Sequence, residues 1–260
     1  MNTELLFDPL FRLPFLTGLV ISVAAATVGL YLRLRSEWLA ALGFAHLAGA
    51  GGVLGVFLGV PAMVAALGAA MLAVAGKGAL RRTGNDVYAW LILAGWATMM
   101  LGASIHQQAK LLGDALVDGQ IYFVSEPKLW AALGVAAAAG LALPALSRTL
   151  LRQHFFPGHD TANGRPVRPY TLAFDLLAAI TVAVTALVMG VMAAFALVFL
   201  PAWLAYAHAG GWRRAVAWTA GIATTGYVMA FAGALVLDLP FGPVLAAVLA
   251  LAVGLRALAR

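Results

Sequence analysis

Apolar residues fill most of the chain in long runs, and polar residues are confined to the breaks between them. A bilayer is crossed only by helices and closed barrels, and a helical span needs about 20 residues. Runs rich in Ala, Leu, Gly and Val therefore predict transmembrane helices. The expected spans cover roughly these ranges: 14–32, 37–60, 61–76, 87–106, 129–147, 170–189, 191–209, 215–237 and 241–258.

Two of these ranges fit a full crossing less well than the others. Range 61–76 is short, and range 191–209 contains Pro201, which either breaks the helix or keeps it from crossing fully. The pattern predicts an all-α polytopic membrane protein with eight or nine transmembrane helices, in a single transmembrane domain over residues 1–260.

Composition supports this class and excludes a soluble one. Hydrophobic residues make up 63% of the chain and charged residues 10%, with a mean hydropathy of +0.96. A soluble domain needs far more charge on its surface. The chain has no cysteine, which excludes disulfides and thiolate metal ligands. The net charge of +6 comes from basic residues at the ends of apolar runs, so it indicates membrane topology and not a nucleic-acid partner.

Basic residues mark one side of the expected membrane. Each group of them follows an odd-numbered span, so nine crossings place every group in the cytoplasm by the positive-inside rule. This predicts an N-terminus outside and a C-terminus inside. The start, with Glu4 and Asp8, lacks the positive charge of a secretory signal. The groups are Arg33 and Arg35; Lys77, Arg81 and Arg82; Arg148, Arg152, Arg165 and Arg168; Arg213 and Arg214; and Arg256 and Arg260.

Two loops are longer than a connection between helices needs. The outer one runs from Gln107 to Lys128 and mixes acidic, basic and amide residues. The inner one, about residues 152–169, is polar, basic and rich in Pro and Gly. Both are compatible with plain connectors, but short turns would suffice for that. The inner loop is therefore expected to dock a partner.

His46 is the one ionisable residue in the apolar stretch LGFAHLAGAGG. It lies about ten residues after Ser36, which is about 15 Å along a helix and close to the middle of the bilayer. Small residues at fourfold spacing, Ala41, Ala45 and Gly49, predict that this helix packs inside the protein. Two interpretations stand: a neutral imidazole that only packs, or a functional group on a transport path.

The helical face that His46 shares offers it no ligand, since that face carries Leu42, Gly49, Ala50 and Val53. A proton or metal partner must come from another helix or from a second copy of the chain. Other titratable and soft groups are interpreted more simply. Glu37, Asp86 and Asp175 are expected near helix starts, favoured by the helix dipole. Methionines are expected to pack, and tryptophans near the interfaces to anchor: Met99, Met100, Met189, Met192, Trp38, Trp90, Trp130 and Trp212.

No catalytic motif is present. AGKGA, at residues 75–79, is partly similar to a phosphate-binding loop, but Met71 and Gly78 stand where that loop needs Gly and Ser or Thr. The chain is therefore not expected to be an enzyme, and no catalytic residue and no cofactor are expected.

Five segments, in order, resemble the permease subunit of zinc- and manganese-type ABC importers. The family's Gly-Asp-x-x-Ser-His element corresponds to residues 41–46, and its outer segment to GQIYFVSEPKLW from Gly119. The inner loop resembles the family's ATPase-coupling segment. MAAFALVFLPAWLA from Met192 and LDLPFGPVLA from Leu237 are similar to two later segments of the family.

The resemblance implies a type II-like ABC importer permease in the cytoplasmic (inner) membrane of a prokaryote. It implies a homodimer, a cytoplasmic ABC ATPase dimer, an extracytoplasmic solute-binding protein, and a transition-metal cargo of the zinc, manganese or iron class or a metal complex. His46 would line the translocation path or touch metal. The residues expected to couple to the ATPase are Phe155, Phe156, Asp160, Gly164, Arg165 and Arg168.

Three positions depart from the family's pattern. Leu42 stands in place of its aspartate, Ala45 in place of its serine, and Lys128 in place of an acid. A lone imidazole is a poor ligand set for a divalent ion. Two alternatives therefore stay open: a permease of this fold for another small solute, and a structural or assembly membrane protein that kept the fold and lost transport. A proton-coupled transporter would need a deep carboxylate.

Overall fold

The computed structural model describes residues 8–79, 84–119 and 121–258, and every regular element within them is a helix. Glu4, Arg81, Arg82, Gln120 and Arg260 lie outside these residues. The α-helices are α1 (Arg12–Leu34), α2 (Ala40–Leu58), α3 (Ala62–Ala79), α4 (Asn85–Ile105), α5 (Gln107–Asp118), α6 (Glu126–Phe155), α7 (His159–Ala162), α8 (Arg168–Met189), α9 (Val191–Tyr206), α10 (Trp212–Leu237) and α11 (Phe241–Leu258). Two short 3-10 helices, η2 (Pro9–Phe11) and η3 (Ile121–Phe123), precede α1 and α6.

Each of the nine expected spans corresponds to one helix of the structure. Six helices among the described residues are long and apolar enough to cross a membrane: α1, α2, α4, α6, α8 and α10. The other three, α3, α9 and α11, are apolar but shorter. Helix α9 runs through Pro201 without a break. An all-helical chain with several membrane spans is thus confirmed, whereas the count of eight or nine stays a prediction.

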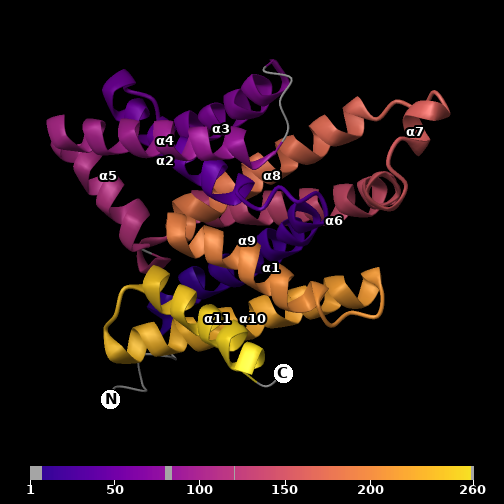
Figure 1. Cartoon of the computed structure of the whole chain (residues 1–260). Coiled ribbons are helices and arrows are strands. Elements are labelled where there is room, and N and C mark those ends of the chain that lie inside the picture. The colour runs from indigo at the N-terminus through magenta and orange to yellow at the C-terminus, as the bar shows by residue number, and fades with distance from the viewer. Residues whose placement is uncertain (1–7, 80–83, 120, 259–260) are drawn as a thin grey trace.

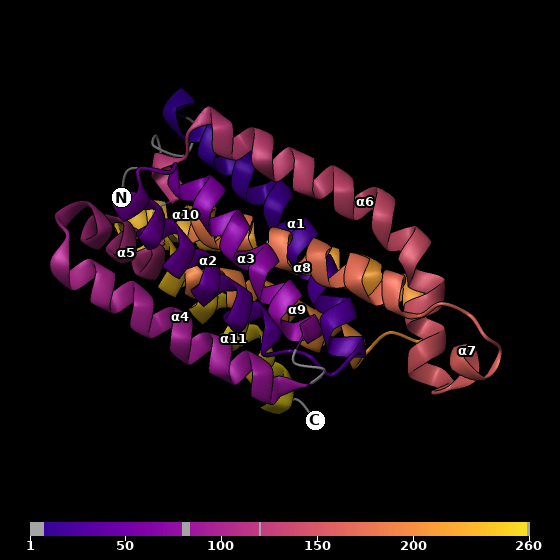
Figure 2. The same ribbon diagram turned by 90° about the horizontal axis from the view of Figure 1, so that it is seen from above.

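The helices form three layers (Figure 1). Helices α2, α3 and α4 make one side, α10 and α11 the other, and α1, α8 and α9 lie between them. Helix α2 contacts α3, α4, α8 and α9, so it is surrounded by protein along most of its length. Viewed from above, α6 and α4 lie at opposite edges of the bundle (Figure 2). This arrangement agrees with the expectation that the small-residue helix bearing His46 is packed inside.

Both long loops contain helices that the hydrophobic pattern did not predict. The outer loop holds α5, a 12-residue helix whose polar positions Lys110 and Asp114 are exposed. The inner loop, expected from residue 152, holds the short α7, and α6 extends to Phe155, so residues 152–155 belong to the helix. Neither helix has the unbroken apolar run by which a span is found.

Three glycines from distant segments meet at one junction on the predicted outer side. Gly119 has a φ of +77° and Gly190 a φ of +92°, a region that favours glycine. A Cβ atom on Gly119 would overlap the Met189 carbonyl oxygen and lie 3.2 Å from the Gly242 nitrogen, and one on Gly190 would lie 2.8 Å from the Gly119 Cα. The backbone therefore crosses at van der Waals contact where the outer loop, the α8–α9 link and the start of α11 come together.

Candidate translocation site

Helix α4 fixes the position of His46 by close backbone packing. A Cβ atom on Gly95 of α4 would lie 2.6 Å from the carbonyl carbon of His46, so any larger residue there would push the two helices apart. Gly43 of α2 faces the Tyr88 ring of α4, and Gly49 faces Met99. Small residues on facing helices allow this approach, as in other membrane helix pairs. The His46 backbone is thus held between well-packed elements.

The His46 ring makes a local hydrogen bond that sets its tautomer. Its Nδ1 lies 2.8 Å from the Leu42 carbonyl oxygen. Since a carbonyl can only accept, Nδ1 carries the hydrogen and donates it, which leaves a lone pair on Nε2. A backbone carbonyl on one ring nitrogen commonly orients the other nitrogen as a metal ligand. The position at which the family's pattern has a carboxylate thus contributes a main-chain oxygen here.

One chain does not complete a metal site around this nitrogen. Over residues 8–79, 84–119 and 121–258, no group of three His, Asp or Glu side chains is placed to hold a metal ion. His46 and Leu42 form a partly exposed strip on α2, although this helix lies inside the bundle. The Nε2 side of His46 is therefore available to a ligand from outside the chain.

An aromatic face forms where α9 packs near the start of α2. It consists of Trp38, just before α2, and Phe195, Phe199 and Trp203 on α9. The Phe195 and Phe199 rings stack with centroids 5.5 Å apart, and Phe199 contacts Trp38 at 5.7 Å and Trp203 at 5.5 Å. Trp38 and Trp203 are 40% and 41% exposed. The sequence predicts Trp38 as an interfacial anchor, but it does not relate Trp38 to the three aromatic residues on α9.

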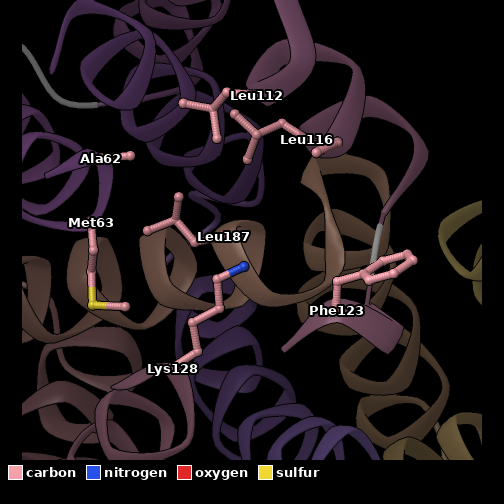
Figure 3. A pocket seen from close by; sticks show the side chains of 8 residues that line it. Ala62, Met63, Leu112, Leu116, Phe123, Lys128 and Leu187 are labelled. Carbon is pink, nitrogen blue, oxygen red and sulfur yellow. The ribbon is translucent and has the colours of Figure 1, made fainter. Parts of the chain in front are cut away.

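Lys128, the third departure from the family's pattern, points into a separate cavity of about 170 Å³ (Figure 3). The cavity lies between the starts of α3 and α6, the end of α5 and the end of α8, and Lys128 is the one charged residue among the described residues that line it. The remaining lining is apolar: Ala62, Met63, Leu112, Ala115, Leu116, Phe123 and Leu187. His46 is not among these residues, so the structure does not bring Lys128 and His46 together at one cavity.

The six residues expected to meet the ATPase divide into exposed and buried ones. Phe155 and Phe156, at the end of α6, are 62% and 65% exposed. Arg165 is largely exposed, and Arg168 begins α8. Asp160 behaves differently, because it is buried and accepts a hydrogen bond of 2.5 Å from Arg152 Nε. Gly164 has a φ of +65° and forms the turn after α7. Asp160 and Gly164 thus shape the loop, and the phenylalanines and arginines form its surface.

A buried charge cluster at the predicted inner side was not expected from the sequence. Glu37 and Asp175 were assigned to helix starts, but Glu37 precedes α2 by three residues and Asp175 lies well inside α8. Both are buried and form ion pairs with Arg35 and Lys77. Asp86 does lie in the first turn of α4, where the helix dipole favours it. The available signal was Lys77 itself, an ammonium within an apolar run that needs an anionic partner.

Together, the bundle, the exposed strip with its histidine and the inner loop define a polytopic membrane subunit of a transporter. The model of the ABC 3 transport family matches residues 8–259. The chain belongs to the ABC 3 transport family, which confirms the resemblance seen in its sequence segments. A search of curated proteins found no match.

Two solved structures share the fold. One is PsaBC from Streptococcus pneumoniae in complex with Fab, with a TM-score of 0.81 and 20% identity over 95% of this chain and 90% of that chain. The other is described as a metal-chelate type ABC transporter in an inward-facing conformation, with a TM-score of 0.74 and 16% identity over 99% of this chain and 91% of that chain. At these identities the likeness establishes the fold.

Proposed function

We propose that this chain is the permease subunit of an ABC importer that moves a transition-metal ion, or a complex of one, into the cell. The observation that carries the proposal is His46, whose Nε2 lone pair is available on a partly exposed strip of a buried helix. Family membership and the metal-chelate description of one similar structure support the cargo class. The energy comes from ATP hydrolysis in a separate chain.

A second copy of the chain would supply a second imidazole. Imidazole and carboxylate groups hold zinc in sets of three or four, and a single chain offers one imidazole here. Two His46 side chains facing each other across a dimer axis would form a weak, transient site, and weak binding suits conduction. The aromatic face of Trp38, Phe195, Phe199 and Trp203 would be covered in the same interface.

The proposal includes the membrane orientation that the basic residues indicate. The N-terminus lies outside and the C-terminus inside, with eight or nine helices crossing the cytoplasmic membrane. An extracytoplasmic solute-binding protein delivers cargo to the outer side. ATPase subunits dock on the inner loop through Phe155, Phe156, Arg165 and Arg168, and their closure on nucleotide alternates access to the path.

Replacing the histidine tests the cargo path. His46→Ala should lower uptake of zinc or manganese by about tenfold or more while the protein remains in the membrane, because the path loses its one nitrogen ligand. His208→Ala is the matched control, since His208 makes the same local bond of 2.8 Å, to Leu204, at the end of α9. Unchanged uptake in His46→Ala would reduce His46 to a packing residue.

Charge reversal tests the dock. Arg165→Glu combined with Arg168→Glu should release the ATPase in co-purification, since both cations lie on the surface of the inner loop. Reversing Arg213 and Arg214, two exposed cations at the start of α10, is the control of equal charge change. Retention of the ATPase by the first variant, or its equal loss from both, would remove the docking role from the loop.

A second candidate is a permease of the same fold for an anionic small solute. The observation that favours it is Lys128, which brings a positive charge into an apolar cavity where the family's pattern has an acid. Uptake of metal by Lys128→Glu that matches or exceeds the wild type would favour the cation. A wild type that takes up a small anion, with that uptake lost in Lys128→Glu, would favour the anionic cargo.

A further inference from the structure

The buried charge cluster consists of Arg35, Glu37, Lys77, Asp175 and the hydroxyl of Tyr88. Its two carboxylates and two cations cancel in formal charge. Glu37, Lys77 and Asp175 are 5%, 6% and 5% exposed, and Tyr88 is fully buried. Burying charged groups removes their hydration, a cost in free energy that apolar side chains of the same volume would not carry. Its value lies in the particular helices that it joins.

Lys77 is the centre of the cluster. Its Nζ lies 3.0 Å from Glu37 Oε2, 3.0 Å from Asp175 Oδ2 and 2.8 Å from the Tyr88 hydroxyl. The three hydrogens of an ammonium group thus each have an acceptor. The Tyr88 hydroxyl in turn donates to Glu37 Oε2 at 3.1 Å. One side chain from α3 therefore binds groups that belong to the α1–α2 turn, α4 and α8.

Arg35 closes the cluster from the end of α1. Its guanidinium donates to Asp175 Oδ1 at 2.9 Å and to Glu37 Oε1 at 3.2 Å. Asp175 is thus held twice, once by Arg35 and once by Lys77. The turn that carries Glu37 is itself fixed, since Asn85 of α4 accepts from the Leu39 amide at 3.3 Å and donates to the Ser36 carbonyl at 3.3 Å.

The path of the chain gives this cluster its mechanical position. Helix α8 begins at Arg168, directly after the loop expected to dock the ATPase, and Asp175 lies about 10 Å further along. Glu37 lies three residues before α2, the helix that carries His46. The cluster therefore connects the helix that leaves the dock with the helix that carries the candidate path residue.

The helix on the other side of the loop reaches the same region. Asp160 of α7 is bound to Arg152, so α7 is attached to the end of α6. A cavity of about 280 Å³ then separates α6 from the α1–α2 turn, with Gln153 and His154 on one side and Arg35 and Ser36 on the other. Contact there is loose, so the direct ionic connection from the loop to α2 runs through α8.

We propose that Lys77, Glu37 and Asp175 are positioning residues of the transport cycle, which hold the start of α8 against the start of α2 so that both helices move as one body. The proposal rests on the proposed function in that the inner loop receives the ATPase. Motion of the loop then reaches His46 through a rigid ionic connection, and not across the cavity that separates α6 from the α1–α2 turn.

The test measures this connection in the complex with its ATPase, in lipid nanodiscs. The chain has no cysteine, so spin labels attach only where cysteines are introduced, at Leu172 of α8 and Leu54 of α2 in one labelled copy, both positions exposed. The variant is Lys77→Met with Asp175→Asn, which removes one cation and one anion and leaves the Arg35–Glu37 pair. The matched control is Lys110→Met with Asp114→Asn, the same substitutions at exposed positions of α5.

In the wild type and the control, ATP binding should leave the distance between the labels unchanged. In the variant, the distance should shift by several ångströms on ATP binding, and metal moved per ATP hydrolysed should fall by about tenfold while hydrolysis continues. A variant whose distance and transport ratio match the wild type would overturn the proposal, and so would a wild type whose distance changes with ATP.

Two further measurements keep the test decisive. If the first variant does not fold, Glu37→Gln with Lys77→Gln removes the same connection, retains amide hydrogen bonding and leaves the Arg35–Asp175 pair; the same outcomes then apply. The label distances need no cargo, so a wild-type complex that moves no metal would contradict the proposed function and leave the distance test intact.

Discussion

Ionisable groups are fully paired in the charge cluster, whereas His46 is paired on only one of its two nitrogens. In the cluster each charged side chain has at least two partners drawn from different segments of the chain. Around His46 a single local bond to Leu42 satisfies one nitrogen and leaves the other available. The difference separates two uses of polarity in a membrane: fully paired charges hold helices together, and an incompletely paired group can bind something that comes and goes.

The largest expected effect comes from unbalancing the cluster. Lys77→Met leaves Glu37 and Asp175 with Arg35 as their one cation, and breaking a buried pair in this way costs about 3–5 kcal/mol. Unfolding in detergent, by heat or denaturant, measures the loss. Lys110→Met, at an exposed position, should stay within about 0.5 kcal/mol of the wild type. A Lys77→Met protein as stable as this control would mean that the cluster holds nothing together.

An intermediate effect is expected from giving His46 the partner that it lacks. Leu42→Asp places a carboxylate one turn before His46 on the same face, so zinc or manganese binding by the purified permease should tighten about tenfold, or 1.4 kcal/mol. Competition with a chelating dye measures the affinity. Leu47→Asp, about 100° around the helix, is the control. Equal gains at both positions would show a general charge effect and no site at His46.

The smallest expected effect is the loss of stability when one tyrosine hydroxyl is removed, and two tyrosines allow a comparison. The Tyr88 hydroxyl is bonded to both Lys77 and Glu37, so Tyr88→Phe should destabilise the protein by about 1 kcal/mol. The Tyr122 hydroxyl is buried without a hydrogen-bond partner in the described structure, and burial, with a smaller effect of Asp238, raises the pKa of Tyr122 to about 12. Tyr122→Phe should therefore cost less than about 0.5 kcal/mol. Thermal unfolding of the two variants side by side gives the answer, and equal losses would contradict the assignment.

Apolar run length alone located the six long and the three shorter apolar helices among the described residues. Their ends lie within about three residues of the expected ranges, except that α6 continues to Phe155 where the range ended at 147. This succeeds because a bilayer imposes one length and one composition on every span. Helix α5 escaped because 12 amphipathic residues with Lys110, Asp114 and Asp118 satisfy neither condition. Helix α9 continues through Pro201, since surrounding helices can satisfy the carbonyl that a proline leaves free. The alternative, that this shorter helix does not cross the membrane fully, stays a prediction.

The site was predictable only in part. The depth and isolation of His46 follow from its neighbours in sequence, and the absence of a ligand on its own helical face follows from periodicity. The charge cluster joins positions 35, 37, 77, 88 and 175, which no local pattern relates. The aromatic face escaped for the same reason, since Trp38 meets Phe199 only after α2 and α9 have packed.

At the junction of Gly119, Gly190 and Gly242, the residues that fix the helix positions differ from the residues that form the outer surface. Helix positions there are set by backbone meeting backbone, with no side chain taking part. Exposed neighbours such as Phe123 can then vary freely without shifting the helices beneath them. Under the proposed function, exposed loop residues on this side can therefore change with the partner that they meet. The three glycines cannot, because a side chain at any of them would press against a neighbouring backbone.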